Sequence, residues 1–175
     1  MKVIYAKTIL HCYPKFQSVL EVLDDLVEKK AIAGFEDFRP CDVQAEEILK
    51  ITEKKVNVIK LKSMCDCILK TFNPEERAYL DYKYFKQKPA ESYSHIDFTT
   101  RNYYRKQVRL ATVFANKLKK VGYTDQKFES LCQDVYFFSA ALSAVKEWER
   151  AMNKNKPVAL KEVQSNEFKP IKRVA

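Results

Sequence analysis

Apolar residues recur at intervals of three and four along most of the chain, which is the spacing of one face of an α-helix. The segment "KFQSVLEVLDDLVEKKAIAG" is the first clear case. Its apolar stripe consists of Phe16, Val19, Leu20, Leu23, Leu26 and Val27. Pro14 lies at a plausible first turn, and Gly34 follows the expected end. The run "KVIYAKTIL" before this helix alternates only loosely and is compatible with a short strand.

A longer helical pattern extends from about Val43 to Leu69. Asp42 is its candidate N-cap, and Glu46 and Glu47 lie in the first turns, where carboxylates complement the helix dipole. The apolar positions continue along the whole segment, so we expect a long central helix against which other elements pack.

The clearest helix start is "NPEERAYLDYKYF". Asn73 is suited to the N-cap and Pro74 to the first helical position, while Glu75 and Glu76 are favourable near the positive end of the dipole. The following segment is irregular and holds at most a short helix around Pro89 to Tyr93.

Two further helices complete the pattern. Thr99 or Thr100 is expected to cap a helix that runs to about Val121 and closes at Gly122. Thr124 is expected to cap the last helix. The apolar face of this last helix consists of Phe128, Leu131, Val135, Phe138, Leu142, Val145 and Trp148.

These elements predict an all-α fold of five to six helices. Residues 1–72 are expected to form a helical scaffold, and residues 73–121 a helix-turn-helix-like module. Residues 122–152 are expected to form a helix that packs on the scaffold. Residues 153–175, with two prolines and little periodicity, are expected to form a flexible basic tail.

Charge and cysteine content narrow the class of protein. The 175 residues have a formal net charge of +9, which favours polyanionic partners. No secretory signal precedes the cysteines, whose odd number and scatter suit a reducing, cytoplasmic compartment. No apolar run approaches the roughly 20 residues that span a bilayer, so we expect no membrane association.

The chain offers little for catalysis or cofactor binding. Its two glycines exclude a glycine-rich phosphate loop. Cys65 and Cys67 lie two apart on a predicted helix and therefore point in different directions, which favours packing over zinc binding. The carboxylates come in adjacent pairs whose side chains diverge on a helix, whereas a catalytic acid/base pair needs two groups that converge. We therefore expect no enzyme activity, no metal and no cofactor.

One helix stands out by charge. From Arg101 to Lys120 it contains seven basic residues and no acid. On a helical wheel the predicted buried edge consists of Tyr104, Val108, Ala111, Ala115 and Leu118, with Phe114 extending it. The opposite edge consists of Asn102, Arg105, Lys106, Arg109 and Lys117. Arg can bind both guanine acceptors in the major groove, Asn does the same for adenine, and Lys reaches phosphates.

The pair "FNPEERAYLDYKYF" and "FTTRNYYRKQVRLATVFANKL" resembles the fourth region of bacterial sigma factors, and more closely the ArpU-type regulators of phage late genes. The resemblance covers about residues 68–118. It implies a non-enzymatic, sequence-specific DNA-binding transcription regulator with a helix-turn-helix, from a bacterium or phage. Double-stranded DNA is the implied partner, and RNA polymerase or a second copy of the chain are further candidates. The implied nucleic-acid-binding residues are Thr99, Thr100, Arg101, Asn102, Tyr103, Arg105, Lys106, Arg109 and Lys117.

Two alternatives use the same surface. A helical protein-interaction adaptor would keep the helix-turn-helix shape without reading bases. An RNA-binding protein would stack bases on Tyr93, Tyr103 or Tyr123.

Overall fold

The computed structural model describes residues 1–36, 40–86, 93 and 100–154, and the expected all-α fold is confirmed there. These residues contain no strand. The elements are α1 (Val3–Cys12), the 3-10 turn η1 (Tyr13–Lys15), α2 (Phe16–Glu36), α3 (Cys41–Lys70), α4 (Pro74–Leu80), the π-helical segment η2 (Asp81–Phe85), α5 (Thr100–Lys120), α6 (Asp125–Asp134) and α7 (Tyr136–Lys154). The short helix expected at residues 89–93 and the tail at 153–175 lie outside the described residues, apart from Tyr93 and the end of α7.

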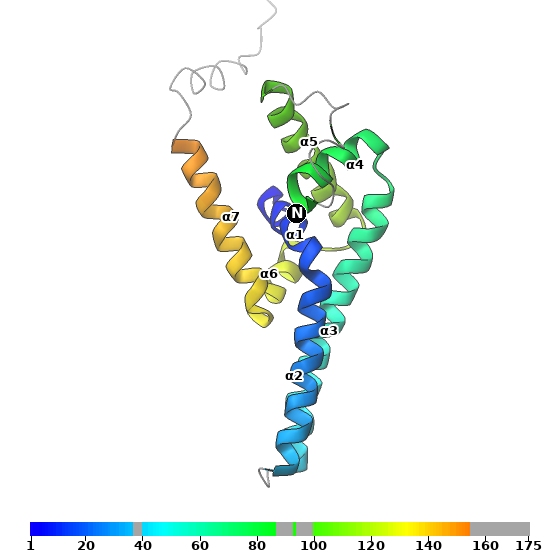
Figure 1. Ribbon diagram of the computed structural model, residues 1–175, viewed down its shortest axis with the longest axis vertical. Helices are drawn as coiled ribbons and strands as arrows, with labels where there is room; N and C mark the ends of the chain where they lie inside the picture. The colour runs from blue at the N-terminus through cyan, green and yellow to red at the C-terminus, as the bar shows by residue number, and fades with distance from the viewer. Residues whose placement is uncertain (37–39, 87–92, 94–99, 155–175) are drawn as a thin grey trace, which may run out of the picture.

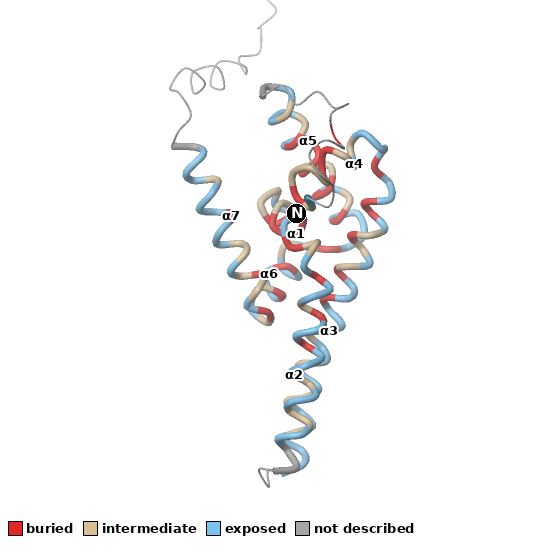
Figure 2. The backbone as a smooth tube through the Cα atoms, in the orientation of Figure 1, coloured by how far each residue is buried: buried red, intermediate tan, exposed pale blue. Residues whose placement is uncertain are grey.

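The long helices α2 and α3 run side by side as a hairpin that extends away from the other helices (Figure 1). Their buried side chains lie in the half next to the body (Figure 2). In the distal half, hydrophobic side chains such as Ile32, Val43 and Leu49 are exposed. The long central helix expected from the sequence is therefore present, but half of it packs only on α2.

Helix α1 lies at the centre of the body and packs on α5 and α7. The short strand with which this segment was compatible is not formed, because Val3–Cys12 is helical. Six of its ten residues are buried: Tyr5, Ala6, Thr8, Ile9, Leu10 and Cys12. A helix buried around most of its circumference has no polar face, so its sequence lacks the helical period that amphipathic surface helices show.

The helix ends of the predicted module follow the expected local chemistry. The Asn73 side chain accepts a hydrogen bond from the Glu76 backbone N–H at 2.7 Å, and the Glu76 carboxylate accepts one from the Asn73 N–H at 3.4 Å. This reciprocal pair is a capping box. At the other end of the module, Gly122 closes α5 with a positive φ of 79°, a conformation that favours glycine.

The last predicted helix is interrupted. Thr124 caps α6 as expected, accepting from the Lys127 N–H at 3.4 Å. Val135 then adopts an extended conformation and separates α6 from α7. No glycine or proline marks this break in the sequence. Its effect is that Val135 and Phe138 both enter the core, where the Phe138 ring lies 5.6 Å from that of Phe16.

Two other helix boundaries differ from the expected ones. Helix α3 begins at Cys41 after Pro40, so Asp42 lies inside the first turn and is not the N-cap. Helix α2 continues to Glu36, so Gly34 lies within it. In both cases the hairpin packing extends the helices slightly beyond what local sequence indicated.

Candidate nucleic-acid interface

The exposed face of α5 contains three of the predicted DNA-contacting residues in one row. Asn102, Arg105 and Arg109 are all exposed and are spaced by three and four positions, so they lie on one stripe. We call Asn102, Arg105 and Arg109 the polar stripe. Figure 1 shows that the N-terminal turns of α5 extend beyond the helices of the body. The stripe is therefore open to a large partner.

The buried face of α5 differs from the predicted one in its first half. Tyr104 and Val108, which were expected to be buried, are 44% and 56% exposed. Gln107 and Leu110 are buried in their place. In the second half, Ala111, Phe114, Ala115 and Leu118 are buried as predicted. The packing against α1 thus selects a face rotated by about one residue from the expected one.

Two of the predicted basic residues contact the first turn of α4. Lys106 donates to Glu75 at 2.6 Å, and its ammonium group lies 4.5 Å from the centre of the Tyr79 ring. The hydrogen bonds to Glu75 and Tyr79 raise the pKa of Lys106. Arg109 lies 3.7 Å from Glu76. The capping box that starts α4 therefore also places two carboxylates beside the basic helix.

Lys117 and Tyr103 lie apart from the polar stripe. Lys117 donates to the Thr71 hydroxyl at 2.5 Å and lies 4.3 Å from the centre of the Phe72 ring, so it anchors α5 to the end of α3. Tyr103 is half-buried and lines a cleft on another side of α5. Thr99 and the side chains of Thr100 and Arg101 lie outside the described residues.

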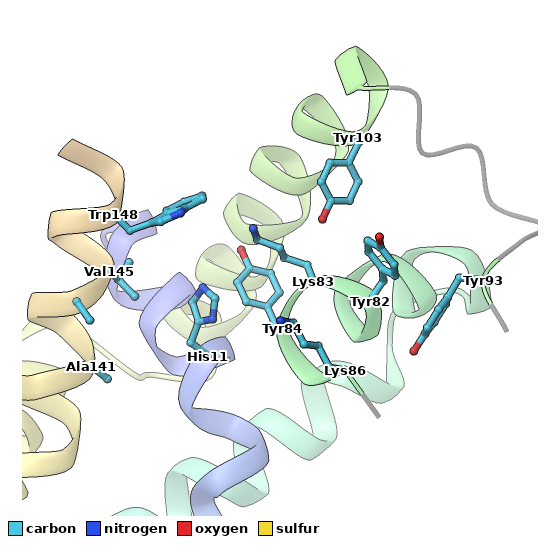
Figure 3. A pocket seen from close by; sticks show the side chains of 11 residues that line it. His11, Tyr82, Lys83, Tyr84, Lys86, Tyr93, Tyr103, Ala141, Val145 and Trp148 are labelled. Carbon is cyan, nitrogen blue, oxygen red and sulfur yellow. The ribbon is translucent and has the colours of Figure 1, made fainter. Parts of the chain in front are cut away.

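The cleft that Tyr103 lines is the second notable feature (Figure 3). It has a volume of about 900 Å³ and lies between α1, η2, α5 and α7. Its walls are His11, Tyr82, Lys83, Tyr84, Lys86, Tyr93, Tyr103, Ala141, Ala144, Val145 and Trp148. Sequence reasoning missed this site. The only local signal was the alternation of aromatic and basic residues in "YKYFK".

The cleft is electropositive, and this changes the titration of its walls. Burial lowers the pKa of Lys83, and the positive charges of Lys86 and Lys7 lower it further. Desolvation lowers the pKa of His11 to about 4, with repulsion from Lys83, Lys7 and Lys86 adding to the shift, although part of the ring is open to solvent. The His11 ring packs edge-on against Tyr84 at 4.6 Å. At neutral pH the His11 side chain in this cleft is therefore neutral.

The described residues contain no group of three or more His, Cys, Asp and Glu that could hold a metal ion. Cys65 is buried in the core and Cys67 is exposed, as expected for positions that point in different directions. Burial raises the pKa of Cys12 to about 12, so this thiol is not activated. None of the described helices is long and apolar enough to cross a bilayer.

Comparison with known proteins gives no relative from which to infer function: no family model, no curated protein and no solved structure matches the chain.

Proposed function

We propose that this protein is a non-enzymatic transcription regulator that binds double-stranded DNA through α5. The supporting observation is the exposed polar stripe of Asn102, Arg105 and Arg109 on a helix without a single acidic residue. The major groove admits one α-helix, and residues three and four apart on that helix reach successive base edges.

The chemistry of the stripe suits base recognition. Arg105 is exposed, and its guanidinium fork matches the two acceptors of guanine. Asn102, one turn earlier, has the donor and acceptor pair that matches adenine. Net positive charge on the whole chain adds long-range attraction to the phosphates.

The carboxylates of α4 oppose this binding only weakly. Glu75 and Glu76 pair with Lys106 and Arg109 at the surface, and exposed ion pairs of this kind are worth roughly 0–1 kcal/mol each. A phosphate can replace either carboxylate at small cost. Lys106 and Arg109 therefore remain suitable for the DNA backbone, and we assign Arg105 and Asn102 to the bases.

The test is fluorescence anisotropy with a random-sequence duplex at low and moderate salt. The double variant Arg105→Glu/Arg109→Glu should bind far more weakly, and the salt dependence of the residual binding should be shallower by about one unit of slope for each phosphate that the protein no longer neutralises. Lys29→Glu/Lys60→Glu is the matched control, because both lysines are exposed on the hairpin and the net charge changes equally. Equal loss in both variants would mean that only net charge matters and would refute the stripe.

A protein-interaction adaptor is a second candidate, supported by Tyr104 and Val108. These two side chains lie beside the stripe and expose apolar surface that a DNA-binding helix does not require. Absence of duplex binding by the unmodified protein at about 50 mM salt would favour the adaptor over the regulator. The RNA-binding alternative loses two of its three stacking residues, because Tyr93 is only 3% exposed and Tyr123 only 6% exposed.

A further inference from the structure

The cleft contains positive charge, and none of the eleven described residues that line it is a carboxylate. Lys83 is half-buried, and its ammonium group lies 4.6 Å from the centre of the Trp148 ring. Glu149 lies near the cleft but is held by Lys7 at 2.5 Å. A half-buried lysine normally acquires an anionic partner, because burial without one is costly. The cleft is therefore suited to an anionic ligand.

The walls on either side of Lys83 are aromatic. Figure 3 shows the Lys83 side chain between Trp148 on α7 and Tyr103 on α5. Trp148 is 43% exposed, which leaves much of its indole ring available for stacking. Tyr82 lies next to Tyr103, with the two ring centres 6.0 Å apart. The aliphatic part of the lining is small: Ala141, Ala144 and Val145. Flat aromatic ligands fit such walls better than long acyl chains do.

The volume of the cleft limits the size of the ligand. Sites for small organic ligands usually enclose about 300–1,000 Å³. The cleft, at about 900 Å³, is at the upper end of this range and is partly open to solvent. A ligand consisting of one ring system, one sugar and one or two phosphates is of suitable size.

We infer that this cleft binds a nucleotide, with the base stacked on Trp148 and Tyr103 and the phosphate held by Lys83 and Lys86. Binding would replace the cation–π interaction of Lys83 with a charge-assisted hydrogen bond, which is the stronger interaction. A free nucleotide and an unpaired nucleotide in a single strand share this chemistry, so the test distinguishes these two sources.

This inference does not depend on the proposed DNA binding. The polar stripe lies on the exposed side of α5, whereas Tyr103 lies on the side that faces the cleft. Loss of duplex binding and loss of nucleotide binding are therefore separate results, obtained with separate variants.

Trp148 is the only tryptophan in the chain, so its fluorescence reports on the cleft alone. Four ligands are titrated, with a tryptophan amide solution as the inner-filter control: adenosine monophosphate, adenosine, inorganic phosphate and a single-stranded oligo(dA). Calorimetry provides the affinities independently of fluorescence. We expect adenosine monophosphate to quench Trp148 saturably, and both adenosine and inorganic phosphate to bind at least about tenfold more weakly.

Substitutions of Lys83 and Trp148 test which side chain binds which part of the nucleotide. Lys83→Gln should weaken adenosine monophosphate about tenfold, since it removes a hydrogen bond to a charged group. Lys146→Gln is the matched control, because Lys146 is exposed on α7 and does not line the cleft. Trp148→Leu, followed by calorimetry, tests the stacking. Circular dichroism confirms that each variant keeps its helicity.

Each result of these titrations either identifies the ligand or overturns the inference. If oligo(dA) binds more tightly than adenosine monophosphate and loses as much affinity in Lys83→Gln, the ligand is single-stranded nucleic acid. If the free nucleotide binds as tightly as oligo(dA) or more tightly, the ligand is a small effector. Inorganic phosphate that binds as tightly as the nucleotide would overturn the inference, because the aromatic walls would then contribute nothing. Equal affinity of the unmodified protein and Lys83→Gln would overturn it as well, as would the absence of any binding.

Discussion

The capping box of α4 allows a quantitative prediction about the helix that places Glu75 and Glu76 beside α5. The change is Asn73→Ala, which removes the side-chain acceptor of the Glu76 N–H at 2.7 Å. The reciprocal bond from the Asn73 N–H to the Glu76 carboxylate remains possible, but at 3.4 Å it is weak. The main loss is therefore one helix-capping hydrogen bond.

The magnitude follows from the exposure of the site. Asn73 is exposed, so water replaces the missing acceptor and no buried polar group is left without a partner. Replacing a good N-cap by alanine then costs about 1 kcal/mol of unfolding free energy. For a chain of this size that corresponds to a decrease in Tm of about 2–4 °C.

The assay is urea denaturation followed by circular dichroism, with thermal melts as a second measure. Two reference variants make the result specific. Asn73→Asp should keep most of the stability, because aspartate is an equally good cap and its charge complements the helix dipole. Thr124→Ala should cost less than Asn73→Ala, since the Thr124 hydroxyl accepts at 3.4 Å and lacks a reciprocal partner. The reasoning is refuted if Asn73→Asp is as destabilising as Asn73→Ala, or if Thr124→Ala costs as much.

Three further predictions concern a titrating residue, a turn and the hairpin. The folded pKa of His11 is about 4, below the unfolded value of 6.5, so the unfolded state binds more protons between these values and stability should fall as pH decreases from about 6.5 to 4. Because the ring is partly open to solvent, we expect the free energy of unfolding to decrease by no more than about 1 kcal/mol. Denaturation at several pH values should show this decrease in the unmodified protein and in His95→Gln but not in His11→Gln. The same pH dependence in His11→Gln would contradict the assignment of the effect to His11. Gly122→Ala should lower the free energy of unfolding by about 1 kcal/mol, since no atom lies within 4 Å of the added Cβ and only the positive φ opposes the substitution. Gly122→Asn should lower it less in the same denaturation assay. An unchanged stability of Gly122→Ala would exclude the left-handed turn. Backbone amides in the distal half of the α2–α3 hairpin should exchange hydrogen far faster than those of α1, because few of their side chains are buried; equal protection in native-state exchange would instead mean that a partner covers the hairpin.

Local chemistry in the sequence was sufficient for the helix ends of the module. Asn73 with Pro74, Thr124 and Gly122 all occupy the positions that their side chains or backbone freedom predict. Each of these signals depends on interactions within about four residues, so neighbouring residues alone determine the outcome. The all-α class followed from the same periodicity.

Errors arose where burial on several sides hid the pattern. The sequence of α1 was also compatible with a short strand, because most of its residues are buried and few polar positions mark a helical period. The break at Val135 has no local signal, since valine is compatible with both helix and extended chain. It is the packing of Phe138 against Phe16 that accompanies the change in direction.

For the candidate interface, the sequence alone determined that α5 is a basic helix whose Asn102, Arg105 and Arg109 share one side. It did not determine which apolar side is buried, because Tyr103, Tyr104 and Val108 offer two neighbouring stripes of similar hydrophobicity. The packing of α5 on α1 and α3 decided between these stripes. The cleft depended entirely on tertiary structure: Lys83 and Trp148 are 65 positions apart, and only the packing of α7 on α1 brings their side chains together. Helical period reports how residues are distributed around one helix, whereas a site between helices depends on how those helices pack.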